Sequence, residues 1–192
     1  MEIDLKYKCT TDLAELSPLL EFAMTELKKD FMKEGRLESV FSFECDQEDS
    51  ILELVPSSSH FLQSPELKGM LGTLLRGFAQ ELSDTDKEPM VVFSACEAWV
   101  SAPIDKDDKE EEKRIREEGV GAQDNKKEAL IFNFESKTQH RMITYEIIRS
   151  DVDDSFVVSP TPTMDEIADK EGGKLTTKFQ VWVDGKIWRN EK

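Results

Sequence analysis

The apolar residues in the first half of the chain recur at helical spacing in two places. Ser17 supplies a capping hydroxyl, Pro18 suits the first helical position, and Gly35 is a natural stop. We therefore predict a helix over residues 18–34. A second Ser-Pro pair begins a broad apolar stripe, which predicts a helix over residues 65–82. The apolar positions are Leu20, Met24, Leu27 and Phe31 in the first helix, and Leu67, Met70, Leu71, Leu74, Leu75, Phe78 and Leu82 in the second.

The second predicted helix also contains Gly69, Gly72 and Gly77. Each glycine costs ~0.8–1 kcal/mol relative to alanine in a helix interior. Tolerated surface glycine is the more common explanation, and close approach of another group to the helix backbone is the alternative. One hypothesis that follows is an apolar small-molecule cavity between this helix and a sheet.

The rest of the chain is dominated by strand patterns. Residues 40–43 and 51–55 predict two short strands, and residues 90–102 are small or apolar on both alternating faces, as in a covered central strand. Further along, residues 129–135 and 141–149 predict an antiparallel hairpin, and Asp184-Gly185 predicts another between a strand at 175–183 and its return through 187–188. Residues 151–174 suit a long surface loop with one helical turn at 164–168.

The order of these elements predicts the fold class. Helices come early and strands then follow one another, without the strict alternation that a parallel sheet requires, so the class is α+β. We expect an antiparallel sheet of four to six strands with the two helices packed on one face. Residues 1–192 should form a single domain.

One segment should stand outside this core. Every residue from 105 to 118 is charged except Ile115, and Gly119 and Gly121 follow. Such a stretch buries too little apolar surface to offset the entropy of ordering it. We therefore predict a flexible charged insertion at about 105–127, either a mobile loop or a frayed helix.

Composition excludes several classes of function. The net charge is −16, from 41 acidic and 25 basic residues, and such a field repels the phosphates of DNA and RNA. No apolar run approaches the ~20 residues of a membrane span, and the N-terminal residues lack a signal-peptide pattern, so we expect a cytoplasmic protein. Three distant cysteines and two histidines argue against disulfides and metal sites. Phosphate-binding glycine motifs are missing as well, and we expect no cofactor.

Glu97 is the main candidate for chemistry. Alternation places it with apolar residues on one face of the strand at 90–102, and a buried carboxylate must be paired, hydrogen-bonded or protonated. Glu135 ends the next strand, and Arg141 or Arg149 on the following strand could lie nearby. Two carboxylates on one sheet face could perform general acid and base catalysis, as in a small hydrolase or lyase. The alternative is a structural pair between Glu97 and an arginine, or a strand-end charge that reaches water.

A thiol nucleophile is a weaker candidate. Cys96 could act with His60 or His140 as its base. A cysteine among apolar residues on a central strand is more often a small core residue, and we expect His140 to be exposed in a hairpin turn.

Part of the chain resembles a loose group of short bacterial proteins with no assigned function. The segment Ser94-Ala-Cys-Glu-Ala-Trp99 is followed by Lys127-Glu-Ala-Leu-Ile-Phe132 and then Glu135. In that group, as here, a helix runs into a strand that ends in a Ser-x-x-Glu-Ala-Trp-like pattern. The resemblance covers about residues 65–150 and implies a bacterial or phage-related source. It supplies no activity or catalytic residue, and the charged insertion departs from the pattern.

These observations favour a non-enzymatic interaction or regulatory module with an acidic surface. Its partner would be a basic patch on another protein, with an encounter that electrostatics accelerate and salt weakens. A variant is that the acidic N-terminal region imitates nucleic acid toward a DNA-binding protein. The hydrolase or lyase and the small-molecule-binding domain remain the alternatives.

Overall fold

The computed structural model describes residues 11–46, 51–55, 65–85, 87–100, 109–118, 126–150, 152–153, 155–169, 181–183 and 186–187. Its main sheet has seven strands in the order β2-β1-β3-β4-β5-β6, with β7 also paired to β5, and β8 and β9 form a separate pair. All these pairings are antiparallel. In chain order the elements are α1 Pro18–Glu34, β1 Val40–Asp46, β2 Ile51–Leu54, α2 Pro65–Asp84, β3 Glu88–Val100, α3 Lys109–Glu118, β4 Lys127–Ser136, β5 Gln139–Arg149, β6 Phe156–Val158, β7 Met164–Asp169, β8 Trp182–Val183 and β9 Lys186–Ile187.

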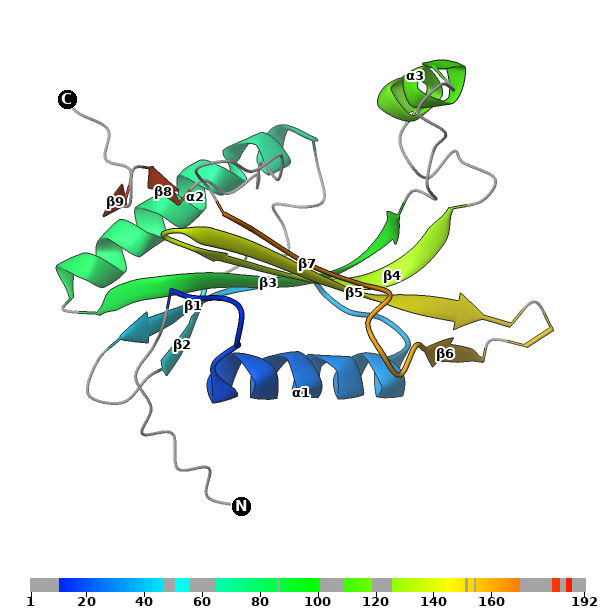
Figure 1. Cartoon of the computed structure of the whole chain (residues 1–192), viewed down its shortest axis with the longest axis horizontal. Coiled ribbons are helices and arrows are strands. Elements are labelled where there is room, and N and C mark those ends of the chain that lie inside the picture. The colour runs from blue at the N-terminus through cyan, green and yellow to red at the C-terminus, as the bar shows by residue number, and fades with distance from the viewer. Residues whose placement is uncertain are drawn as a thin grey trace.

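The two long helices cover opposite faces of the sheet (Figure 1). Successive side chains of a strand point to opposite faces, and in β3 both sets are apolar. Phe93 belongs to a core with Leu20 and Phe31 of α1, whereas Val92 belongs to a second core with Leu71 and Leu75 of α2. We refer to these two sides as the α1 face and the α2 face.

The α+β class and the antiparallel sheet are confirmed, and the structure differs from the prediction in two details. The sheet has seven strands instead of four to six, and the helices lie on both faces instead of one. The second difference follows from β3, because a strand that is apolar on both sides needs cover on both sides.

The additional strands come from the segment predicted as a loop. Residues 164–168 form no helical turn: they belong to β7, which pairs with β5 from Gln139 opposite Asp169 to Thr144 opposite Met164. The sequence of β7 has no alternating apolar pattern. Its strand conformation comes from pairing with the backbone groups of β5.

Both ends of α1 are determined by residues close to them in the sequence. The Ser17 hydroxyl accepts a hydrogen bond from the Leu20 N–H at 3.2 Å and donates one to the buried Glu44 carboxylate at 2.5 Å. At the other end Gly35 adopts a left-handed φ of 73°, and its N–H donates to the Phe31 carbonyl at 2.8 Å. Both predicted ends of this helix are confirmed.

The charged insertion predicted at about 105–127 is described in two places. Residues 109–118 form α3, and Lys127 at its end already belongs to β4. Residues 105–108 and 119–125 lie outside the described residues. The hairpin predicted around residues 184–185 is confirmed by the pairing of β8 with β9. None of the described helices combines the length and apolar character that crossing a bilayer requires.

The interface between α2 and the sheet is a packed apolar core. Leu71, Leu75 and Ala79 are buried against Phe43 and Val92. A Cβ atom added at Gly77 would meet nothing within 4 Å, so this glycine faces open space. The hypothesis of a small-molecule cavity here receives no support from the described residues.

Candidate functional site

Glu97 lies on the α1 face of β3, as its position in the alternating pattern predicted. Its neighbour across the sheet is Leu130 of β4. The Arg149 guanidinium donates to Glu97 Oε1 at 3.0 Å, and the backbone N–H of Leu37 donates to Oε2 at 3.4 Å. With a quarter of the side chain exposed (25%), this carboxyl is held by the protein and still touches solvent.

A second carboxyl shares the same arginine. Arg149 donates from Nε to Glu128 Oε2 and from Nη2 to Glu128 Oε1, both at 2.7 Å. This two-pronged geometry is the strongest form of an ion pair between arginine and a carboxylate. Glu97, Glu128 and Arg149 come from β3, β4 and β5, and we call them the acid–arginine cluster.

The surroundings shift the pKa values of the two carboxyls of the cluster in opposite directions. Burial raises the pKa of Glu97, and a hydrogen bond with Glu128 raises it further. The bond from Arg149 lowers the pKa of Glu128. Of the two carboxyls, Glu128 therefore loses its proton at the lower pH. Glu97 keeps its proton to a higher pH and is the hydrogen-bond donor of the pair.

This difference predicts opposite pH effects for two glutamine variants. The raised pKa of Glu97 gives stability that is present below its ordinary value of 4.5 and is lost as the pH rises through the folded value. The lowered pKa of Glu128 gives stability that is present above 4.5 and is lost as the pH falls. Relative to wild type, Glu97→Gln should therefore gain stability as the pH rises toward neutral, whereas Glu128→Gln should lose it.

Denaturant unfolding at a series of pH values measures both effects. Each variant serves as the control for the other, because the two substitutions remove the same charge from the same cluster. Parallel pH profiles would contradict the assignment of the proton to Glu97.

Glu135 does not join this cluster. It lies on the α2 face of β4 opposite Val92, is 1% exposed, and accepts a hydrogen bond from the Val181 N–H at 3.1 Å. Glu97 is five residues further along β3 on the other face, about 16 Å along the strand. The predicted carboxylate pair of Glu97 and Glu135 is therefore wrong, and Glu135 instead holds the segment that begins β8.

Arg141 is also separate from Glu97. It forms a two-pronged ion pair with Asp165 of β7 at 2.8 Å for each bond, which lowers the pKa of that carboxyl. Its Nη1 donates to the carbonyls of Leu13 and Ala14 at 2.8 and 3.1 Å. These contacts attach the segment before α1 to the sheet, which is a structural role.

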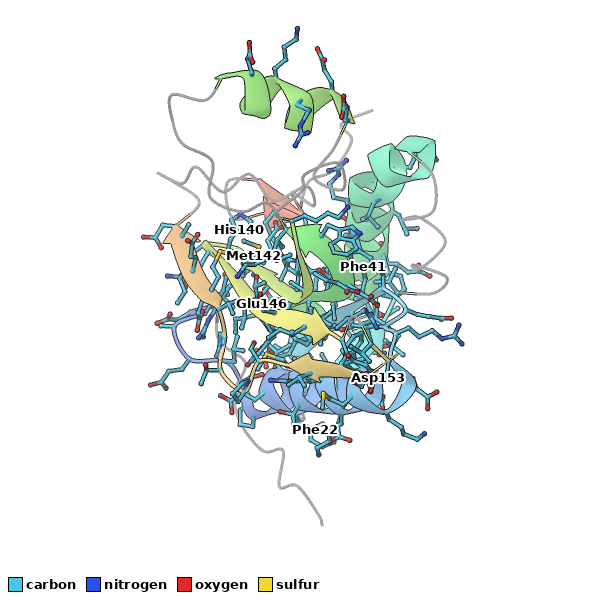
Figure 2. The ribbon with its side chains drawn as sticks, turned by 90° about the vertical axis from the view of Figure 1, so that its right-hand side faces the viewer. Phe22, Phe41, His140, Met142, Glu146 and Asp153 are labelled. Atoms are coloured by element: carbon cyan, nitrogen blue, oxygen red, sulfur yellow. The ribbon has the colours of Figure 1, made fainter. Side chains whose placement is uncertain are left out.

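The register of the strands also contradicts the hypothesis that Cys96 is a thiol nucleophile with His140 as its base. Cys96 is opposite Ile131, which is opposite Thr144, so His140 lies four residues away along β5, about 13 Å. His140 is 6% exposed within β5, not exposed in a turn as predicted, and Figure 2 shows it with Met142 and Glu146 along that strand. His60 lies outside the described residues.

Glu128 was not identified from the sequence, because the predicted strand began one residue after it. The strand was predicted to begin at residue 129, whereas β4 begins at Lys127 and places Glu128 opposite Trp99. The sequence signal that could have identified Glu128 is its place as an acidic residue directly before a predicted buried strand. Within the described part of the chain no three His, Cys, Asp or Glu side chains gather as they would around a metal ion.

The fold and the cluster together define an α+β protein whose antiparallel sheet is covered on both faces and carries a carboxyl–arginine site at one end of β3. Comparisons with protein-family models, curated proteins and solved structures give no match to this chain. The resemblance to short bacterial proteins therefore stays a prediction.

Proposed function

We propose that this chain is a non-enzymatic interaction module that binds a basic surface of another protein. The proposal rests on the exposed acidic residues of β7. Asp165, Glu166 and Asp169 are exposed on this strand, and among the described strands only β5 pairs with it. β7 is therefore an acidic edge of the sheet.

The distribution of positive charge supports this proposal. Arg141 and Arg149, the two arginines of β5, are occupied by contacts within the fold. The acids at 166 and 169 on β7 are exposed, and the whole chain has 41 acidic residues against 25 basic ones. Such a surface accelerates encounters with a basic partner and discriminates against acidic ones.

An edge strand offers a specific way to bind. A partner segment in extended conformation can add to a sheet through main-chain hydrogen bonds, while its side chains provide specificity. Charged side chains on an edge also discourage pairing with unrelated strands. The acids of β7 would therefore admit an extended segment rich in lysine or arginine.

Capture experiments across a salt series test this proposal. The wild-type chain should retain a partner from its native lysate at low salt and lose it at high salt. The double variant Glu166→Gln/Asp169→Asn should weaken capture several-fold, because exposed ion pairs contribute about 0.2–1 kcal/mol each. Asp165 is left intact because it pairs with Arg141.

The matched control is Glu117→Gln/Glu118→Gln, which removes the same charge from exposed positions on α3. An equal loss in both double variants would show that net charge, not β7, determines binding. If no salt-sensitive partner is captured by the wild-type chain, the proposal is wrong.

A second candidate function rests on the acid–arginine cluster. Two carboxyls with pKa values moved in opposite directions are the arrangement that acid–base enzymes use. A hydrolase or lyase activity at this cluster would be lost in both Glu97→Gln and Glu128→Gln. An activity that survives in either variant would exclude this candidate.

A further inference from the structure

A groove of about 480 Å³ lies between α1 and the segment that joins β6 to β7. This volume falls within the range of about 300–1,000 Å³ that is typical of small-molecule sites. The groove is separate from β7 and from the acid–arginine cluster. Its lining residues are Thr25, Lys28, Lys29, Met32, Lys33, Val158 and Pro160.

The charge of the groove is opposite to that of the chain. Lys28, Lys29 and Lys33 line it, in a protein whose net charge is −16. At physiological ionic strength charges more than about 8 Å apart are largely screened. Apart from Glu26 and Glu34, which pair with Lys29 and Lys33, the acids of the chain therefore act on a ligand in the groove less strongly than these lysines do.

Lys28 is held in place at the wall of the groove. Its ammonium donates to the Ser159 carbonyl at 3.0 Å and lies 3.6 Å from the centre of the Tyr145 ring. Burial lowers the pKa of this lysine, since its charge has lost part of its hydration. An ammonium has three N–H donors, so an anion in the groove could accept another of them and offset that loss.

Lys29 and Lys33 are the exposed cations of the rim. They pair with Glu26 at 2.6 Å and with Glu34 at 2.9 Å, and the lysine side chains of both pairs are largely exposed. Exposed pairs of this kind are weak, because water and salt screen them. A bound anion can therefore recruit either lysine at little cost.

The remaining surface of the groove is mainly apolar. Met32 comes from α1, Val158 ends β6, and Pro160 follows it. Met32 is about half exposed (48%), so its side chain is available to a ligand. A methionine also adapts its shape readily to different apolar groups.

We propose that this groove binds a small amphipathic anion, namely a carboxylate with a linear apolar tail. The carboxylate lies against Lys28 and one of the two rim lysines. The tail covers Met32, Val158 and Pro160. This site does not depend on the basic-partner function proposed above.

Decanoate, below its micellar concentration, is the probe for this site. Amide spectra of the isotope-labelled chain should shift at residues 25–33 and 158–160 during titration. Decanol lacks the carboxylate that accepts from Lys28, and acetate lacks the apolar tail that covers Met32, Val158 and Pro160. Each should therefore bind at least about tenfold more weakly than decanoate.

The test variant is Lys28→Met, which removes the charge and keeps an apolar side chain over Tyr145. It should weaken decanoate binding about tenfold or more, by the same reasoning about charge-assisted hydrogen bonds. Lys113→Met on α3 removes an exposed lysine elsewhere and should leave binding unchanged. Thermal unfolding of both variants confirms that they are folded, and Lys33→Met provides a second test if Lys28→Met is not.

Three outcomes would overturn the proposal. Decanol binding as tightly as decanoate would show that the lysines contribute nothing. Spectral shifts outside the groove would place the ligand elsewhere. Equal binding by wild type and both groove variants would exclude these lysines as the anion site.

Discussion

The Phe93→Ala variant is expected to lose about 3–5 kcal/mol of its free energy of unfolding. Phe93 is 1% exposed at the centre of the α1 face, and its ring stacks on Phe134 and Phe132 with centroid distances of 5.2 and 6.3 Å. Removing this ring leaves a cavity beside Phe132 and Phe134 of β4, in the core that the sheet shares with α1. Since small domains are stable by only about 5–15 kcal/mol, the loss is a large part of the total.

Denaturant unfolding measures this effect, and Phe22→Ala is the matched control. Phe22 is 43% exposed and projects from the outer side of α1 (Figure 2). Its replacement should change stability by no more than about 0.5 kcal/mol, as is usual for surface positions. Similar losses in both variants would contradict the arrangement of α1 on the sheet.

The second large effect is expected at Ser17. Ser17→Ala should lower the free energy of unfolding by about 2–4 kcal/mol, because it removes both the cap of α1 and a donor to the buried Glu44 carboxylate. Ser17→Thr keeps a hydroxyl and should remain close to wild type. Ser17→Asp should be at least as unstable as the alanine variant, although aspartate is a good cap in general.

The aspartate variant separates the two roles of Ser17. An ionised aspartate can accept from the Leu20 N–H, but it cannot donate to Glu44, and it places a second carboxyl group beside it. The same denaturant unfolding measures all three variants. Wild-type stability in Ser17→Asp would mean that the cap alone matters and that the contact with Glu44 contributes nothing.

Much of the secondary structure could be predicted because its signals are local. The ends of α1 depend on the Ser-Pro start and on Gly35, which act within one turn of the helix. The apolar pattern of β3 likewise identified a central strand. By contrast, β7 carries no strand pattern of its own, and its conformation depends on β5, about 25 residues earlier in the chain.

For a related reason, only part of the acid–arginine cluster could be predicted from the sequence. Alternation placed Glu97 on an apolar face, and an arginine partner was one of the two explanations offered. The choice of Arg149 over Arg141 depends on how far along β3 and β4 each arginine lies, which strand register sets. The choice of Glu128 over Glu135 depends on the face that each occupies, because a shift of one residue moves a side chain to the opposite face. No local pattern in the sequence specifies that register.

The sequence by itself determined the α+β class, the antiparallel sheet, the limits of α1 and the surplus of negative charge. These properties follow from composition and from the spacing of residues close together in the chain. The tertiary structure decided that the helices cover opposite faces, that Glu97 meets Glu128 and Arg149, and that three lysines line one groove. Each of these depends on contacts between distant segments, which form only when burial of apolar surface brings the strands into register.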